Sequence, residues 1–285
     1  KSSLTTADPT VAVKAASYPT SPRSRAARTT ARARPRTRRD RQNNRRIDMQ
    51  PTLQTFGIEE EFMLVDRRTL APAQLAGAAL KHLGQLTREG SISCEFLPSQ
   101  VEHATQVCTE VNEAEQSLLG FRRALAEWSD QHDLIAIPSG TPFVVSHDKV
   151  PPLIDRYELI AEDVGFIASE HFMNGMHVHI GIESAEQGVQ VLNGLRPWLP
   201  VLLAMSSNSP FWAGSDSGHH SWRAIQTRRW TTSGIPPHFA DAGEYETIHQ
   251  RMLGGGATQE YAKTNWAIRL SEHYPTVEVR VFDVQ

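Results

Sequence analysis

Apolar residues recur at every second position in several short stretches of the chain, and this spacing predicts β-strands. Residues 176–182 show it most clearly, because three aliphatic side chains share one face while His177 and His179 share the other. The strands predicted in this way are 54–65, one or two strands within 92–107 with a break at Pro98, 134–137, 176–182 and 276–283.

Elsewhere apolar residues recur every three or four positions, which predicts amphipathic helices. Leu118 to Trp128 follow this spacing, so we expect a helix over 113–131, with Asn112 as its N-cap and Glu115 as the reciprocal acid. Further helices are expected over about 152–165 and, bent at Pro197 and Pro200, over about 185–205.

Residues 206–240 are irregular and contain several prolines and glycines, and their tryptophans argue for an ordered loop. A loop of this length is usually functional or disordered. Strands separated by helices, with polar groups along one sheet face, predict an α+β fold. In this fold, helices pack behind a largely antiparallel sheet.

The first fifty residues differ from the rest of the chain. Residues 1–50 hold 13 of the 29 Lys and Arg residues and three of the 32 acids, a net charge of +10, and they lack hydrophobic periodicity. We expect disorder there, because such a segment cannot bury enough apolar surface to offset its chain entropy. A transit peptide, a nucleic-acid-binding arm and upstream translated sequence ahead of Met49 all fit this composition, and we favour the third. The predicted organisation is an extension over 1–50 and a folded domain over 51–285.

The composition of the folded part argues against some classes of function. Residues 51–285 hold the remaining 16 basic and 29 acidic residues, a net charge of −13, which argues against nucleic-acid binding. Cys94 and Cys108 are the only cysteines, so we expect a reducing, cytoplasmic setting. The apolar runs are too short to span a membrane, and no membrane partner is expected.

Three consecutive glutamates, Glu59, Glu60 and Glu61, lie inside the first predicted strand. Alternation places Glu59 and Glu61 on one face and Glu60 on the other. Two carboxylates on one face repel each other and lose hydration when buried, and a hard divalent cation relieves both costs. Taken alone, however, such a triplet is more typical of a charged strand edge that resists aggregation.

Other predicted strands add metal-competent groups to the same face, namely Glu102, His177 and Glu278. Each of these alone is more often a structural residue than a ligand. The joint pattern favours a metal site, because a solvated sheet face rarely gathers acids and histidine with so few lysines. A mostly carboxylate set with one imidazole suits Mg²⁺ or Mn²⁺ better than Zn²⁺.

Arginines complete the pattern. Arg223, Arg228 and Arg229 lie in the irregular segment, and Arg280 shares a strand face with Glu278. Metal ions and arginines without a nucleophilic Ser or Cys motif are typical of phosphoryl transfer. The chain has no Walker-type Gly-Lys-Ser/Thr loop.

Five segments carry a more specific signal. They are residues 57–62 (GIEEEF), 177–181 (HVHIG), 195–200 (LRPWLP), 208–212 (NSPFW) and 276–280 (TVEVR). Together, in this order from about residue 53 to the end of the chain, they resemble the glutamate–cysteine ligase family, and within it the type-2 carboxylate–amine ligases.

The resemblance implies a fold like the catalytic domain of glutamine synthetase, with a curved, mainly antiparallel sheet that forms a funnel and helices packed outside. It implies ATP-dependent ligation: a carboxylate takes the γ-phosphoryl group of ATP to give an acyl phosphate, and an amine then displaces phosphate. The expected substrates are glutamate and cysteine, the expected cofactors are ATP and Mg²⁺ or Mn²⁺, and homo-oligomerisation is left open.

The resemblance also assigns roles to residues. Glu59, Glu61, Glu102, His177 and Glu278 resemble metal ligands, Arg223 and Arg280 resemble the arginines that face the transferring phosphoryl group, and His179 and Arg228 are expected to bind substrate. Residues 206–240 are expected to cover the site, because acyl phosphates hydrolyse in water. Glu60 has no predicted partner.

Several alternatives stay open at this point. A phosphotransferase acting on a guanidino or amine group has the same fold class, and a metal-dependent hydrolase would be expected to use more histidine ligands. Family members continue beyond the last motif strand, so an inactive, truncated relative is a further reading. The substrate pair is open as well, because nothing in the sequence fixes a thiol pocket.

Overall fold

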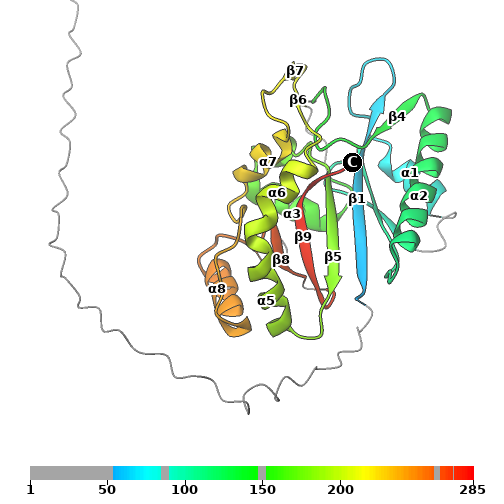
Figure 1. Cartoon of the computed structure of the whole chain (residues 1–285). Coiled ribbons are helices and arrows are strands. Elements are labelled where there is room, and N and C mark those ends of the chain that lie inside the picture. The colour runs from blue at the N-terminus through cyan, green and yellow to red at the C-terminus, as the bar shows by residue number, and fades with distance from the viewer. Residues whose placement is uncertain (1–53, 85–89, 147–151, 260–263, 272) are drawn as a thin grey trace, which may run out of the picture. The chain divides into compact units, whose positions relative to one another are not determined.

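A seven-stranded sheet forms the centre of the protein in the computed structural model, which describes residues 54–84, 90–146, 152–259, 264–271 and 273–285 (Figure 1). Its strands pair in the order β2-β3-β1-β5-β9-β8, with β4 also paired to β1, and the pairs among the described residues are antiparallel. The predicted α+β class is therefore confirmed, and the sheet is open rather than closed. The strands are β1 (Phe56–Asp66), β2 (Ser91–Cys94), β3 (Gln100–Ala104), β4 (Leu134–Ile137), β5 (Gly175–Gly181), β8 (Ile268–Leu270) and β9 (Thr276–Asp283).

Helices flank this sheet. Figure 1 shows α1 and α2 beside β1 and β4, and α5, α6 and α8 beside β8 and β9. The helices are α1 (Ala76–Leu83), α2 (Val111–Gln131), α3 (Asp155–Val164), α4 (Phe166–Ser169), α5 (Ala185–Leu195), α6 (Leu199–Met205), α7 (Trp222–Gln226) and α8 (Ala242–Gly254), with 3₁₀ turns η2 (Arg196–Trp198) and η3 (Thr227–Arg229).

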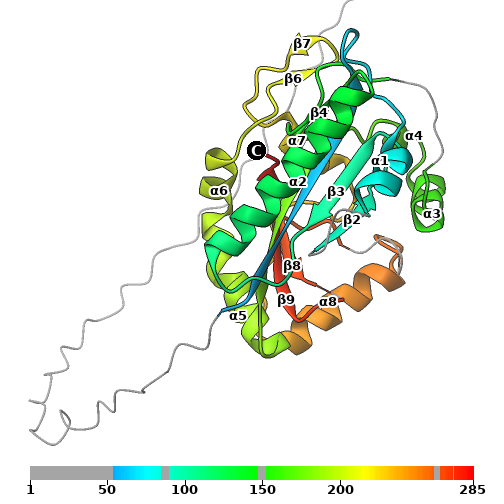
Figure 2. The same ribbon diagram turned by 90° about the vertical axis from the view of Figure 1, so that its right-hand side faces the viewer.

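Strand alternation gives the two faces of β1 different surroundings. Phe62 and Leu64 are buried against Phe121 and Leu125 of α2, which runs along β1 (Figure 2). The opposite face carries Glu59 and Glu61 and then becomes apolar at Met63 and Val65, which pack near α3 and α4. The polar half of this second face is where the predicted site residues lie.

Glu60 lies on the α2 side, where it is 1% exposed. Both of its oxygens accept from Arg122 of α2, at 2.9 Å from Nε and 2.5 Å from Nη2. Arg122 also donates to the carbonyl oxygen of Gln285 at 2.6 Å, so it joins β1 to the C-terminus between α2 and α6 (Figure 2). The partner that the sequence left unidentified for Glu60 is thus an arginine on the covering helix.

A β-bulge interrupts the pairing of β5 with β9. Gly175 and Met176 pair with Asp283 and Phe282, but from Val178 onward the register is shifted by one residue. Two residues of β9, Arg280 and Val281, therefore lie opposite the single residue His177. The sequence predicted Val281 on the apolar face with Val277 and Val279, and Val281 does pack against the same core, although beside the bulge it also lines a cavity together with Arg280.

Most predicted elements are present, with shifted ends. The break at Pro98 separates β2 from β3, and the bend between residues 195 and 199 separates α5 from α6. The predicted cap of α2 is wrong: Glu110, not Asn112, is the N-cap, and Glu113 is the reciprocal acid. The helix consequently starts earlier than the apolar spacing indicated.

The largest differences lie where the sequence shows no periodicity. Residues 206–240 contain α7, η3 and a two-stranded hairpin of β6 (Phe211–Trp212) and β7 (Ser215–Asp216), rather than one irregular loop. Helices α1, α4 and α8 and strand β8 were not predicted. They are short or weakly amphipathic, so the pattern alone does not mark them.

The predicted extension over residues 1–50 lies outside the described residues, and its disorder stays a prediction. In the part of the chain that the structure describes, no helix has the length and apolar character needed to cross a membrane.

Replacing Arg122 by Met should lower the free energy of unfolding by about 3 kcal/mol, because it leaves the carboxylate of Glu60 buried without its partner. The expected loss lies at the lower end for a buried pair, since the Arg122 side chain is 33% exposed. Denaturant unfolding measures it, with the exposed neighbour changed by Arg123→Met as the control. A double change, Glu60→Leu with Arg122→Met, should recover most of the loss, and failure to recover it would argue against a paired charge.

Candidate active site

The sheet register brings the predicted acids and histidines together. Glu59 of β1 lies directly opposite His177 of β5, and Glu61 lies opposite Glu102 of β3. On the other side of β5, His179 lies opposite Glu278 of β9. Four adjacent strands thus contribute side chains to one cluster, although these residues are far apart in the sequence.

Direct contacts tie this cluster together around Glu59. Its Oε2 lies 3.0 Å from Nδ1 of His177, and its Oε1 lies 3.1 Å from Nε2 of His179. His179 is oriented by Thr276, whose hydroxyl lies 2.9 Å from Nδ1. Both imidazoles therefore point toward the same carboxylate.

Glu278 is held by two arginines. Arg269 of β8 donates to Oε2 from Nε at 2.6 Å and to Oε1 from Nη2 at 3.1 Å, and Arg280 also pairs with Oε1. Arg269 was not predicted, because the three residues of β8 are too few to show alternation. Its guanidinium forms a bidentate pair, which is among the stronger charge-assisted contacts in proteins.

Three ligand atoms within this cluster lie close enough to share one cation. One atom each from Glu59, His179 and Glu278 lies within 4.8 Å of the others. The sequence assigned the imidazole ligand to His177 and substrate binding to His179, whereas the geometry places His179 in this trio. His177 adjoins it: its Nε2 lies 3.8 Å from Oε1 of Glu61 and has no hydrogen-bond partner among the described residues.

Glu61, Glu95 and Glu102 form the second half of the cluster, and each accepts one hydrogen bond. The backbone N–H of Gly175 donates to Glu61 at 2.6 Å, the hydroxyl of Tyr157 donates to Glu95 at 2.6 Å, and the hydroxyl of Ser93 donates to Glu102 at 3.0 Å. Glu95 was missed, because it follows a short strand and no pattern distinguishes it from other acids.

Burial and mutual repulsion dominate the protonation of these three carboxyls. Desolvation and the neighbouring charge of Glu95 raise the pKa of Glu61 to about 8. Desolvation and the charges of Glu95, Glu59 and Glu61 raise the pKa of Glu102 well above its ordinary value, and desolvation also raises the pKa of Glu95. Without added positive charge, this half of the cluster favours protonated carboxyls.

The other half is compensated by cations. Burial opposes ionisation of Glu59, but the hydrogen bonds and charges of His177 and His179 hold its pKa well below the ordinary value. Burial is likewise outweighed at Glu278, where Arg280 and Arg269 lower the pKa. The charge deficit therefore lies at Glu61, Glu95 and Glu102, and divalent cations with oxygen ligands would supply it.

The predicted arginines are not equivalent. Arg280 adjoins the cluster, with Nη1 3.5 Å from Nδ1 of His177. Arg223 is 7% exposed and donates from Nη2 to the carbonyl oxygen of Arg280 at 3.3 Å. Arg228 is exposed at the wall of a cavity, whereas Arg229 is paired at 2.5 Å with Glu170.

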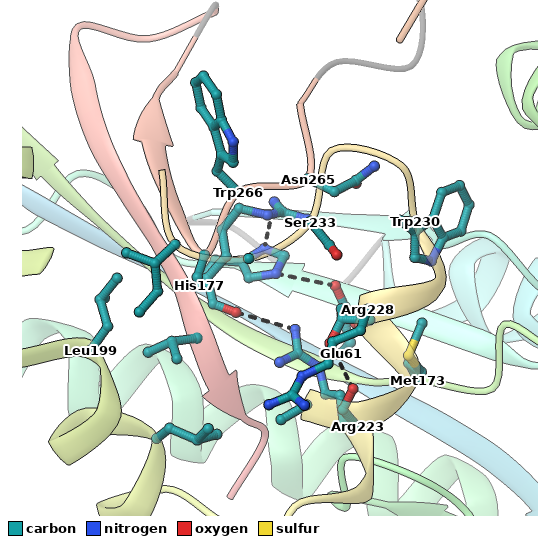
Figure 3. Close-up of a pocket in the computed structure, with 18 of the residues that line it drawn as sticks. Glu61, Met173, His177, Leu199, Arg223, Arg228, Trp230, Ser233, Asn265 and Trp266 are labelled. Atoms are coloured by element: carbon teal, nitrogen blue, oxygen red, sulfur yellow. Dashed lines mark hydrogen bonds and ion pairs between the residues drawn. The ribbon is translucent and has the colours of Figure 1, made fainter. Parts of the chain in front are cut away.

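Cavities reach the cluster from more than one direction. A central cavity of about 300 Å³ contains the acids and both histidines. It shares Glu61, His177 and Arg280 with a cavity of about 310 Å³, in which Glu61, His177 and Arg223 point toward one another (Figure 3). It shares Glu59 and Glu102 with a third cavity, of about 500 Å³, at the N-terminal end of β1.

Comparison with known proteins identifies the family. The sequence model of the family described as "Glutamate-cysteine ligase family 2(GCS2)" matches residues 55–285. The chain belongs to this family. The resemblance drawn from the five sequence motifs is thereby confirmed.

Relatives of glutamate–cysteine ligase family 2 match the same region. A protein of Rhodococcus jostii named "Putative glutamate--cysteine ligase 2-1" is 42% identical over 236 residues, which cover 81% of this chain and 62% of that protein. A protein of the same name from Nocardia farcinica is 39% identical over 230 residues, covering 81% of this chain and 60% of that protein. The chain spans about three fifths of the length of these relatives.

A solved structure shares the fold. It is a glutamate–cysteine ligase of Francisella tularensis, crystallised in complex with AMP, with a TM-score of 0.51 and 14% sequence identity. The match covers 81% of this chain and 61% of that one. At this identity the likeness concerns the fold alone.

The metal-free protein should lose stability as the pH rises from about 6.5 to about 8. Below about 6.5, three buried histidines, whose pKa values burial lowers, act in the opposite direction because only the unfolded chain protonates them. The folded state keeps a proton on Glu61 up to about pH 8, whereas the unfolded chain releases it near 4.5. Stability therefore falls by about 1.4 kcal/mol per pH unit for each extra proton that the folded state holds. Glu95 and Glu102 act in the same direction, because their pKa values are also raised.

Thermal unfolding in EDTA across this pH range measures the effect. Saturating Mg²⁺ should flatten the slope, and Glu61→Gln should reduce it without metal, because glutamine stays neutral. A midpoint that rises between about pH 6.5 and 8 in EDTA would contradict the raised pKa values.

Proposed function

We propose that the chain carries the catalytic site of an ATP-dependent carboxylate–amine ligase, with glutamate and cysteine as the leading substrate pair. The observation that carries the proposal is the cluster of five buried or half-buried carboxylates, one of them paired with two arginines, at the junction of cavities. Membership of the family and the names of the relatives support ligation.

The residues present fit Mg²⁺ or Mn²⁺. Carboxylates and imidazole are suitable donors for these ions, and the raised pKa values of Glu61 and Glu102 mark a place where positive charge stabilises the site. Glu59, Glu61, Glu102, His177 and Glu278 are the proposed ligands, with Glu95 and His179 added from the structure. When bound, the metal neutralises phosphate oxygens and so lowers the cost of bringing a carboxylate to ATP.

The proposed first step forms an acyl phosphate. A carboxylate oxygen of the first substrate attacks the γ-phosphorus of ATP, the bond to the bridging oxygen breaks, and ADP leaves. Arg223 and Arg280 both line the cavity of about 310 Å³, and Arg280 also lines the central cavity, so their guanidiniums can stabilise the charge on the transferring group. Glu278 and Arg269 hold Arg280 in place through the paired contacts described above.

In the second step, the nitrogen of the amine attacks the acyl carbon and phosphate leaves with the broken C–O bond, while the amine loses its proton. Residues of the segment 206–240, among them Arg228, Trp230 and Ile235, line the cavity beside Arg223. We assign this segment the role of excluding water from the acyl phosphate, and Arg228 the role of binding substrate.

The function is tested by product analysis. With glutamate, a panel of amines, ATP and Mg²⁺, the wild-type chain should release ADP and an amide product in equal amounts. Glu59→Gln should reduce turnover by at least about a thousandfold, because it removes the charge of a proposed metal ligand that also contacts both histidines. The control is Glu60→Gln, which changes the adjacent carboxylate on the opposite face and should retain turnover below its unfolding temperature.

A stable phosphorylated product without an amide would replace the ligase proposal with phosphotransfer. Retained turnover in Glu59→Gln would show that the assignment of the metal ligands is wrong.

Mg·ATP should stabilise the folded protein. At a ligand concentration about a hundred times the dissociation constant, the gain is about 2.7 kcal/mol, because only the folded state binds. A thermal shift measures it, and ATP in EDTA should give a smaller shift if binding depends on metal. An unchanged midpoint with Mg·ATP would indicate a relative that keeps the fold without the activity.

A further inference from the structure

A buried carboxylate outside the acid cluster has no role in the proposed chemistry. Asp283, the last residue of β9, is completely buried. Its Oδ2 accepts from the backbone N–H of Asn208 at 2.8 Å and from the hydroxyl of Ser209 at 2.7 Å, and its Oδ1 accepts from the hydroxyl of Ser221 at 2.9 Å. These three partners belong to the segment that carries Arg223.

The same hydroxyls hold the backbone around Arg223. Ser221 is the N-cap of α7 and accepts from the N–H of Ala224, while Ser209 accepts from the N–H of Arg223 at 3.1 Å. Because α7 has only five residues, its position depends on such contacts more than on its own hydrogen bonds. Asp283 is thus the common acceptor that fixes the start of this helix on the sheet.

Asp283 also faces the guanidinium itself. Its Oδ1 lies 4.0 Å from Nη1 of Arg223, and its charge offsets part of the burial that lowers the pKa of Arg223. The other end of the guanidinium lies over Gly175, the cross-strand partner of Asp283. A Cβ atom at Gly175 would lie 2.4 Å from Nη2 of Arg223, so the absence of a side chain provides the space that the arginine occupies.

We propose that Asp283 and Gly175 together position Arg223 toward the acid cluster. Asp283 fixes the start of the helix that carries Arg223 and attracts its positive charge, and Gly175 leaves room for its guanidinium. This inference rests on the catalytic role proposed for Arg223. Asp283 is a positioning residue, since its own contacts are with the segment around Arg223 rather than with the acid cluster.

The first variant removes the charge of Asp283, and the second fills the space above Gly175. Asp283→Asn should lower kcat for amide formation by about 10- to 100-fold, since small misplacements of catalytic groups have effects of this size, and should change KM for ATP much less. Gly175→Ala keeps the carboxylate and displaces the flexible end of Arg223, with a milder contact at 3.0 Å to Nε2 of His177, so it should lower kcat in the same way with a smaller change in thermal stability. Glu60→Gln is the matched control, because it removes a buried charge from the same sheet without contact to Arg223, and should retain kcat.

A double-mutant cycle with Arg223→Lys separates positioning from general destabilisation. If Asp283 acts through Arg223, adding Asp283→Asn to Arg223→Lys should lower kcat by less than about a further threefold. Effects that multiply, an unchanged kcat in both Asp283→Asn and Gly175→Ala, or an unchanged kcat in Arg223→Lys would each overturn the inference.

Hydrogen exchange provides a readout that does not depend on activity. Asp283→Asn should increase amide exchange at residues 206–229 relative to the wild type, and Glu60→Gln should not. Failure of the proposed function would appear as a wild-type chain that forms no amide, whereas unchanged exchange in Asp283→Asn would overturn the positioning role alone.

Discussion

Repulsion among carboxylates is the constraint on which the site depends. Five acids on one face of the sheet lose hydration and face like charges, so the folded state can hold them only by protonation, by pairing or by bound cations. The protein uses pairing at Glu59 and Glu278, where histidines and arginines are within contact distance. At Glu61 and Glu102 the pairing is incomplete, and the need for additional positive charge is built into the fold.

One face of the sheet packs into a hydrophobic core, and the other face carries the acid cluster. On the α2 side, Glu60 is a buried charge beside an apolar core and is satisfied by one arginine. On the other side, apolar packing begins only beyond Glu61, at Met63 and Val65. A single strand therefore contributes to a core, a charged cluster and a second core within eleven residues. The sequence of β1 shows little tolerance for a register shift, because a slip of one residue would exchange these roles.

Strand periodicity was sufficient to predict which acids share a face, because Glu59, Glu61 and Glu278 lie in strands long enough to show alternation. It was not sufficient for Glu95 and Arg269, which belong to or follow strands of three or four residues. It could not place Arg122 against Glu60, since that contact depends on how α2 packs over β1. The same limit applies to His177 and His179, which share a face in the sequence: His179 joins the trio with Glu59 and Glu278, whereas His177 lies between Glu59, Glu61 and Glu278.

The bulge opposite His177 divides the ladder between β5 and β9 into two registers. One register carries His179 and Glu278, and the other carries Gly175 and Asp283 beneath Arg223. The distance along the sheet between the acid cluster and Arg223 consequently depends on the number of residues in β9 rather than on side-chain packing. This distance therefore changes in steps of one residue. Substitutions can tilt one half of the site against the other, but only an insertion or deletion in β9 can shift the two halves by a whole residue.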